Sequence, residues 1–319
     1  MQARPKNPGS HSNTIAITGA TGFVGSTIIK LLVSQGWRVR ALARDPNKLE
    51  QFADCPIEWV YGDLSNSDCL DSLVYNSHAV IHCAGTVRGS QLSDFIAANV
   101  EGVSNLVTAI LADSSQPRLL LISSLAARMP DISDYAKSKR QGEAFLATHI
   151  SQLKWTILRP AAIYGVGDQE MKPLLDLMQK GVCLQLSGAI SRFSLIHVDD
   201  FAQAVAQWLD NGVAEHEIIE IDDGFPNGYG WQDISHIASG VFRRPVKRIY
   251  IPVVILKVLA AVNNFLAKMI NHNPMLTPGK ARELAWHDWV CRSQPKMKIA
   301  HWQPRYQFEQ GLKRLYNTQ

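Results

Sequence analysis

A tyrosine and a lysine four residues apart are the side chains of this sequence best suited to chemistry. They are Tyr135 and Lys139, in the stretch YAKSK. On an α-helix, residues four apart lie on one face. An ammonium group beside a phenol favours the phenolate, so the proton of Tyr135 would become available for transfer near neutral pH. The spacing alone has low specificity, because it also occurs by chance on solvated helices.

A glycine-rich turn near the start of the chain gives this pair a context. Residues 14–17 (TIAI) predict a short buried strand, TGATGFVG follows at 18–25, and an apolar-periodic helix comes next. Strand, glycine turn and helix in this order predict a dinucleotide site, with the pyrophosphate at the helix N-terminus. The predicted cofactor-binding residues are Gly19, Ala20, Thr21, Gly22, Phe23, Val24 and Gly25. The alternative is a glycine-rich turn without a ligand.

The second predicted strand, residues 37–44, bears on which dinucleotide is preferred. NAD enzymes usually carry an acidic residue at the end of this strand, where it binds the ribose hydroxyls. Here Ala43 holds that position, with Arg44 beside it and Arg40 nearby. A guanidinium can form a charge-assisted pair with a 2′-phosphate, so we predict NADP(H) in preference to NAD(H). In the alternative interpretation, Arg44 only faces solvent.

The next predicted elements supply further candidates. Asp63 and Leu64 end the third strand, where Asp63 could hydrogen-bond the adenine amino group. The fourth strand ends in small residues, as expected where backbone passes under a cofactor: Cys83, Ala84 and Gly85. Asn99 falls inside the following helix, where asparagine is locally unfavourable. A structural or proton-relay role and a simple hydrogen-bonded core position are both compatible with Asn99.

A fifth predicted strand leads to a pair of serines. Residues 119–122 (LLLI) form an uninterrupted apolar run, typical of a strand buried on both faces of a parallel sheet. The run delivers Ser123 and Ser124 to its carboxyl end, where ligands bind in open α/β sheets.

Taken together, these motifs resemble the short-chain dehydrogenase/reductase superfamily, in its extended or atypical, epimerase/dehydratase-like branch. The resemblance covers nearly the whole chain after residue 13. It is carried by Thr18–Gly25, Asp63-Leu64, Cys83–Gly85, Asn99, Ser123-Ser124, Tyr135, Lys139, Leu158–Pro160, Ile196–Asp200 and Gly311-Leu312.

The resemblance implies a fold of the α/β class. It is a doubly wound parallel (Rossmann) sheet with a smaller, mostly helical C-terminal substrate domain. We expect the dinucleotide-binding core at residues 14–163 and the substrate-binding part at 164–319, with 193–222 returning to the sheet. Residues 193–200 predict a strand that feeds a helix capped by Asp199. Residues 1–13 are polar, lack the apolar core of a signal peptide and are expected to be a disordered tail.

The family also implies a role for each matching position. Ser124 would hydrogen-bond the substrate oxygen, and Tyr135 would donate or accept the proton. Lys139 would lower the pKa of Tyr135 and bind the nicotinamide ribose, while Pro160 and Ile163 would line the carboxamide edge. With Asn99 as a further catalytic candidate, no member of the set is missing, which argues against a decayed site that only binds cofactor.

Departures from the family pattern bear on the substrate. Leu125 and the two alanines after it stand where sugar dehydratases carry an acid pair, which argues against dehydration. Residues 161–165 (AAIYG) lack the amide that sugar-nucleotide epimerases use, and the spacing of Arg192 to His197 is one residue longer than theirs. These changes favour an NADP(H)-dependent oxidoreductase acting on an apolar carbonyl or secondary alcohol. Hydroxysteroid-dehydrogenase-like and dihydroflavonol-reductase-like members are the nearest in character.

Two other functions remain open at this point. One is an epimerase with a tightly held cofactor, and the other is a non-catalytic NADP-binding subunit or sensor. The apolar segment at 251–270 also has three interpretations: a core helix, a lid over the pocket, or a helix lying on a membrane surface. Two lysines and two asparagines within it disfavour a membrane-spanning helix.

Composition and charge bear on the possible partners, the cellular compartment and metal binding. The net charge of +4, without a basic run interleaved with aromatics, gives no support for nucleic-acid binding. Five scattered cysteines indicate reduced thiols and a cytoplasmic protein, and neither they nor the histidines show metal-ligand spacing. We expect a homodimer or a monomer with a small-molecule substrate, and peripheral membrane contact remains open.

Overall fold

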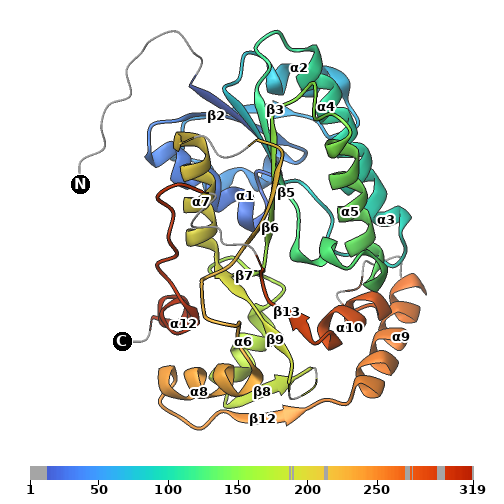
Figure 1. The fold of residues 1–319 in the computed structure, drawn as a ribbon, viewed down its shortest axis with the longest axis vertical. Helices are drawn as coiled ribbons and strands as arrows, with labels where there is room; N and C mark the ends of the chain where they lie inside the picture. Colours follow the sequence, from blue (N-terminus) through green and yellow to red (C-terminus); the bar gives the residue numbers. More distant parts are fainter. Residues whose placement is uncertain are drawn as a thin grey trace.

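A seven-stranded, wholly parallel sheet forms the centre of the molecule, as the sequence predicts (Figure 1). The computed structural model describes residues 13–186, 188, 190–211, 215–269, 274, 276–292 and 299–317. The strands stand in the order β11-β6-β5-β4-β1-β2-β3. They are β1 (Thr14–Thr18), β2 (Arg38–Ala43), β3 (Ile57–Tyr61), β4 (Ala79–His82), β5 (Arg118–Ile122), β6 (Trp155–Pro160) and β11 (Glu217–Ile221). The order reverses between β1 and β4, and ligands bind at such a switch point in open α/β sheets.

Helices cover both faces of this sheet (Figure 1). One face carries α1 (Phe23–Ser34) and α7 (Val198–Asn211), whose apolar side chains share a core with β1 and β4. The other face carries α2 (Ser67–Val74), α4 (Gly102–Ala112) and α5 (Asp134–Ala147). Burial on both faces explains why the central strands read as continuous apolar runs rather than alternating patterns.

One long apolar helix in this layer belongs to the core. It begins with α3 (Ser93–Ile96), passes through a π-helical turn at Ala97–Glu101 and continues as α4. By length and composition alone, Ser93–Ala112 is apolar enough to cross a membrane. Its apolar face, however, packs on the sheet through Leu106 and Val107, which are fully buried.

The second half of the chain leaves the sheet, returns to it once and then builds a separate layer below it (Figure 1). The return is made by α7 and β11, which pairs in parallel with β6. The predicted strand at 193–200 is instead divided into two short strands, and α7 begins at Val198, so Asp199 lies inside the helix. The short parallel pairs are β7 (Ala162–Tyr164) with β10 (Leu195–His197), β8 (Val182–Gln185) with β12 (Lys247–Tyr250), and β9 (Arg192–Phe193) with β13 (Asp288–Trp289).

The remaining helices of the described residues surround these pairs. They are α6 (Lys172–Gln179), α8 (Trp231–Val241), α9 (Val253–Met269), α10 (Pro278–Ala285) and α12 (Phe308–Tyr316). Short 3₁₀ turns lie at Pro46–Lys48, Glu50–Phe52, Leu125–Arg128 and Pro130–Ile132. A second core of aromatic residues, including Tyr164, Tyr229 and Phe308, holds α8 and α12 together. The lower layer therefore contains parallel strand pairs as well as the predicted helices, while the domain limits remain a prediction.

Candidate functional site

The glycine turn after β1 lies directly against the end of β4. Gly19 has a φ of +71°, and a Cβ at this position would come 2.5 Å from the amide nitrogen of Ala84. A Cβ on Gly25 would overlap the carbonyl of Gly19. The backbone amide of Cys83 donates to the carbonyl of Thr18 over 3.3 Å. Both glycines are therefore required by close backbone approaches, as predicted for a turn that passes under a dinucleotide.

The first turn of α1 is left open for a ligand. Gly22 is the N-cap residue, and no side chain caps the helix. The first amides of a helix have no partner within the helix and carry a partial positive charge, so they suit a pyrophosphate. Phe23 stands at the start of this turn, with Gly167 from the loop after β7 beside its ring. The residues present thus fit a bound dinucleotide, with Ala20, Thr21 and Val24 completing the predicted turn.

The two arginines near the end of β2, in the predicted ribose site, have different surroundings. Arg40 is engaged elsewhere: its guanidinium lies 2.7 Å from a carboxylate oxygen of Glu58 and donates to the carbonyl of Tyr75. Arg44 is exposed and makes no ion pair with a described residue. Its charge helps to lower the pKa of Asp63, after the larger effect of hydrogen bonds from Ser65. Arg44 therefore keeps its guanidinium exposed after the end of β2, whereas that of Arg40 is engaged.

The loop after β3 carries the residues predicted to contact the adenine. The Oδ1 of Asp63 accepts hydrogen bonds from the amide and hydroxyl of Ser65, at 2.8 and 2.6 Å. Leu64 packs under the start of α4, where a Cβ on Gly102 would meet its side chain at 2.5 Å. One carboxylate oxygen of Asp63 is thus taken by Ser65, which fixes the orientation of the group.

The two serines after β5 have different partners. Ser124 accepts a hydrogen bond from the amide of Ala126 and lies close enough to Tyr135, the second residue of α5, to lower the pKa of its phenol. Ser123 instead donates to Glu143 over 2.6 Å, and Glu143 is held in turn by Arg159. The structure therefore brings Ser124, and not Ser123, to Tyr135, as the family pattern implies.

Tyr135 itself is protonated more firmly than the sequence predicts. Its pKa is raised from the ordinary value, chiefly by burial, and Ser124 counteracts this in part. The cation with the largest lowering effect on this pKa is Lys280, and not Lys139. The expectation that Lys139 brings the Tyr135 proton into the neutral range is therefore not met in the free protein, because desolvation outweighs the nearby positive charge.

Lys139 is buried beneath the end of β4. Its Nζ donates to the carbonyl of Ile122 over 3.3 Å, and burial lowers its pKa. A Cβ on Gly85 would come 2.8 Å from this Nζ, so the lysine fills the space that the glycine leaves. Burial also raises the pKa of the neighbouring Cys83 thiol to about 12. Lys139 thus lies under the predicted cofactor-binding segment at Gly85, and its contact with the nicotinamide ribose remains a prediction.

Asn99 ties the segment after β4 to α5. It is buried in the π-helical turn, a conformation often found at functional sites. Its Oδ1 accepts from the amide of Thr86 at 3.0 Å, and its Nδ2 donates to the carbonyl of Thr86 and to the hydroxyl of Ser138, at 3.1 and 2.9 Å. These bonds use both N–H donors of the amide and one lone pair of its oxygen, so Asn99 positions the segment at Thr86; its predicted catalytic role remains a prediction.

The sequence analysis missed the residues that α10 brings to Tyr135. Glu283 accepts a hydrogen bond from Ser133, the N-cap residue of α5, and lies 3.2 Å from the Nζ of Lys280. Charges on both residues act on the pKa of Tyr135 in opposite directions. About 150 residues separate α10 from α5 in the chain, and no local motif marks Lys280 or Glu283 as partners of the tyrosine.

Apolar side chains border the ring of Tyr135. Met129, Trp286 and Trp289 pack in one cluster with the tyrosine ring. The ring of Phe95 lies 6.1 Å from it, centroid to centroid. Pro160 ends β6, and Ile163 in β7 packs against the main core.

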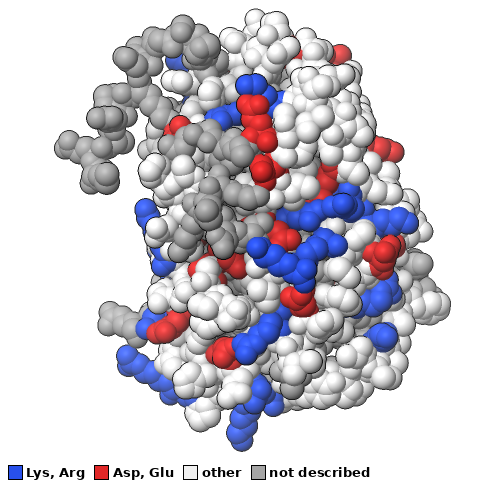
Figure 2. Space-filling model, viewed as in Figure 1, with Lys and Arg blue, Asp and Glu red and all other residues white. Residues whose placement is uncertain are grey.

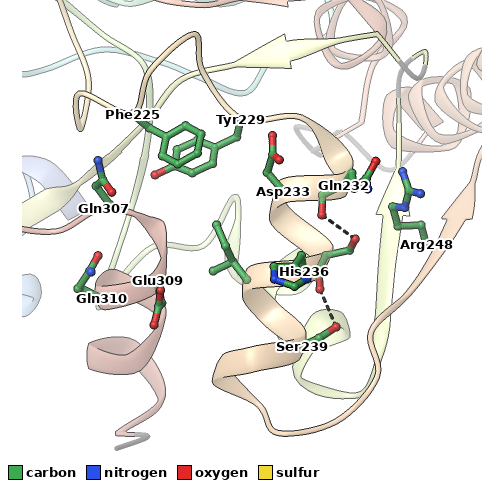
Figure 3. Close-up of a pocket in the computed structure, with 12 residues that line it drawn as sticks. Phe225, Tyr229, Gln232, Asp233, His236, Ser239, Arg248, Gln307, Glu309 and Gln310 are labelled. Atoms are coloured by element: carbon green, nitrogen blue, oxygen red, sulfur yellow. Dashed lines mark hydrogen bonds between the residues drawn. The ribbon is translucent and has the colours of Figure 1, made fainter.

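The arginine that was the candidate contact for a substrate phosphate is engaged elsewhere. Arg192, the candidate phosphate contact, forms an ion pair of 2.6 Å with Asp233. A separate open groove of about 720 Å³ lies between α8 and α12 (Figure 3). Phe225 and Tyr229 stack at one end of it, and His236 lies on its α8 side. None of the predicted site residues lines this groove.

The glycine turn, the open helix N-terminus and the Ser124–Tyr135 pair define the class: a dinucleotide-binding protein with a Rossmann fold. Residues 15–221 match the NAD dependent epimerase/dehydratase family. The chain belongs to this family and is an NAD(P)-dependent enzyme of the oxidoreductase type.

Individual relatives agree with this assignment. The chain is 35% identical to a protein named ceramide reductase from Caulobacter vibrioides, over 88% of this chain and 87% of the relative. It is 26% identical to the NADH-ubiquinone oxidoreductase 40 kDa subunit of Neurospora crassa, over 81% and 69% of the two chains. Among solved structures, a UDP-glucuronic acid 4-epimerase from Bacillus cereus, 17% identical, has the same fold with a TM-score of 0.73 and covers 95% of this chain and 98% of its own.

Proposed function

We propose that the protein is an NADP(H)-dependent oxidoreductase that interconverts a carbonyl and a secondary alcohol. The observation that carries this proposal is that Ser124, after β5, lies close enough to Tyr135 to lower the pKa of its phenol, at the carboxyl edge of the sheet. A positioned phenol and hydroxyl at this edge form a proton donor and an oxygen-binding group for one substrate atom.

The protein's part in the reaction is to bind the oxygen and manage one proton. The nicotinamide, when bound, supplies the hydride that adds to the carbonyl carbon. Tyr135 gives its phenolic proton to the carbonyl oxygen, and Ser124 hydrogen-bonds the same oxygen. In the oxidative direction, Tyr135 takes the proton back. Because its pKa is raised, Tyr135 is protonated throughout the neutral range, which suits the reductive direction.

The preference for NADP(H) is part of the same proposal. β2 ends at the buried Ala43, so no carboxylate stands there to bind the ribose hydroxyls or to repel a 2′-phosphate. The exposed guanidinium of Arg44 follows directly. A 2′-phosphate would gain a charge-assisted hydrogen bond from it.

The substrate that fits this site best is an apolar lipid carbonyl of the ceramide type. Tyr135 is bordered by Phe95, Met129 and Trp286, which suit an alkyl chain better than a sugar. Arg192 is already paired with Asp233 and is not placed to bind a diphosphate. The most similar of the relatives described above is named ceramide reductase, which supports the same substrate class.

The test follows NADPH absorbance with a ceramide-type ketone in detergent, a short aliphatic ketone and UDP-glucose. We expect consumption of NADPH with the first substrate and a loss of roughly 100- to 10,000-fold in Tyr135→Phe, with NADPH binding retained. Tyr75→Phe is the matched control, because Tyr75 is 67% exposed at the end of α2.

Other outcomes would assign a different function. Conversion of UDP-glucose to its epimer without net loss of NADPH would identify an epimerase. NADPH binding without turnover of any carbonyl, and without an effect of Tyr135→Phe, would favour the binding-subunit alternative.

A further inference from the structure

The outer face of α9 carries many exposed apolar side chains. Seven aliphatic or aromatic side chains of this helix are between 49 and 72% exposed. They are Val254, Ile255, Val258, Leu259, Val262, Phe265 and Leu266. At 100° per residue these side chains occupy a single broad stripe. A helix on the surface of a globular protein normally presents charged and polar residues there.

The opposite face of α9 is already occupied by the protein. Leu256 and Ala260 are buried against Ala281 of α10, and Asn263 donates to the carbonyl of Leu276 over 2.9 Å. The helix is thus anchored to the body by its inner face. Its outer stripe touches no described part of the core clusters, so α9 is not a core helix on that side.

The segment that carries this stripe is also the most basic in the chain. Residues 234–282 contain eight lysines and arginines and no aspartate or glutamate, whereas the rest of the chain has a net charge of −4. Lys247 and Arg248 are exposed on β12, directly before α9, and Lys257 is exposed beside the stripe. In Figure 2 the lower right edge, over α9, shows white and blue side chains without red ones.

We propose that the outer face of α9 and the basic strand β12 dock the protein on an anionic lipid membrane. The helix would lie flat, with the apolar stripe at the boundary of headgroups and acyl chains and the basic side chains on the headgroups. The 17 residues of α9 span about 25 Å, less than the roughly 30 Å hydrocarbon core, so the helix lies on the bilayer and does not cross it.

A second copy of the chain is a poorer occupant for this surface. An isologous dimer would place the two acid-free, basic segments against each other, and like charges in contact oppose association. An anionic bilayer complements both the apolar stripe and the charge.

Docking there would also bring the active site close to the lipid. The inner face of α9 packs on α10, and α10 carries Lys280, whose charge acts on Tyr135. The single helix α9 therefore separates the proposed membrane face from α10, which borders the tyrosine. The docking proposal itself does not depend on the identity of the substrate.

The experiment measures sedimentation of the whole chain with vesicles of phosphatidylcholine alone or mixed with phosphatidylglycerol. We expect binding to the mixed vesicles that weakens with added salt. The double variant Val258→Gln/Val262→Gln should lose about tenfold or more of this binding, although glutamine favours a helix more than valine does. Ile150→Gln, at a 55% exposed position after α5, is the matched control and should bind normally.

A second variant separates the charge from the apolar stripe. Lys247→Gln/Arg248→Gln should lose about tenfold of its binding to the mixed vesicles and little of its binding to the neutral ones. The unfolding temperature of each variant, compared with that of the unchanged chain, checks that the fold persists.

Three results would overturn the proposal. The first is an absence of binding to the mixed vesicles at low salt. The second is equal binding by the unchanged chain and Val258→Gln/Val262→Gln. The third is a dimer in sedimentation velocity that this double variant abolishes without any vesicle binding, which would assign the face to a second copy. Turnover of a short ketone tests the oxidoreductase separately, so either proposal can fail alone.

Discussion

The two walls of the site differ in how the chain builds them. The cofactor wall is made of turns that directly follow β1, β4 and β5, so each residue is placed by the strand just before it. The substrate wall is made by α10 and Trp286, which reach Tyr135 from about 150 residues away. The first wall therefore depends on local backbone geometry, whereas the second depends on long-range packing and can change without disturbing the cofactor site.

The largest effect on stability should come from adding a side chain where α1 touches the glycine turn of the cofactor wall. In Gly25→Ala the new Cβ would overlap the carbonyl of Gly19, and neither backbone can move without displacing the turn. We expect the free energy of unfolding to fall by about 3 kcal/mol or more, with loss of NADPH binding. Thermal unfolding and NADPH titration measure both effects.

Gly240→Ala is the control for this variant. Gly240 lies in α8, and a Cβ there would meet nothing within 4 Å. The substitution should be neutral or stabilise the helix by about 0.5–1 kcal/mol. A normal NADPH affinity in Gly25→Ala would show that the turn does not need to lie against the helix.

A buried histidine under the cofactor wall should make the fold sensitive to acid. His82 is 1% exposed, and burial lowers its pKa from 6.5 to about 3. The folded state thus binds fewer protons than the unfolded state between these values, so stability is lost as the pH falls below about 6.5. At pH 5 the loss should be about 2 kcal/mol.

His82→Asn keeps a polar atom near Thr18, whose Oγ1 lies 2.8 Å from the histidine Nδ1, and should flatten this dependence. Denaturant unfolding at several pH values measures the slope. An unchanged slope in the variant would place the acid sensitivity elsewhere.

A buried aspartate in the second half should act in the opposite direction. Burial raises the pKa of Asp223 from 3.8 to about 7, although Tyr229 donates a 2.6 Å hydrogen bond to it. The folded state binds more protons here, so stability falls as the pH rises from about 4 to about 7. Between pH 5 and 7 the loss should be about 2 kcal/mol. Asp223→Asn should remove this dependence of the unfolding free energy on pH and leave the dependence due to His82. A change of both dependences in this variant would contradict the separation of the two regions.

The difference between the walls also explains what could be predicted from the sequence. The sheet and the glycine turn follow from short contiguous motifs, and the pairing of Ser124 with Tyr135 was implied by the family resemblance. The roles of Lys280 and Glu283 were not predicted, because no spacing links them to α5. The direction of the Tyr135 pKa was wrong for the same reason: burial by Trp286 and its neighbours comes from a distant segment.

A smaller effect, on cofactor preference, should come from the exposed arginine after β2. Arg44→Ala removes the guanidinium at the end of β2 and should lower the ratio of kcat/KM for NADPH to that for NADH about tenfold. Arg38→Ala is the matched control, because Arg38 is exposed at the start of the same strand. Steady-state kinetics with both cofactors measure the ratio. An equal ratio in Arg44→Ala and the unchanged chain would remove Arg44 from cofactor selection.

The smallest effect concerns the charges that α10 places beside Tyr135. Reduction requires the protonated phenol, so the rate falls as the pH rises through the pKa of Tyr135. Glu283 raises this pKa and Lys280 lowers it. Glu283→Gln should therefore move the basic limb of the pH–rate profile to lower pH, and Lys280→Gln should move it to higher pH.

Lys280→Arg keeps the charge and is the control for this pair. The Lys280 side chain is 39% exposed, so its replacement should leave the unfolding temperature nearly unchanged. Opposite shifts from the two α10 variants, with a normal profile in Lys280→Arg, would show that the distant wall tunes the proton donor. Two results would show that the cofactor wall alone tunes the proton donor. One is a shift of the pH–rate profile in the same direction in both α10 variants, and the other is a profile that moves only in Lys139→Met.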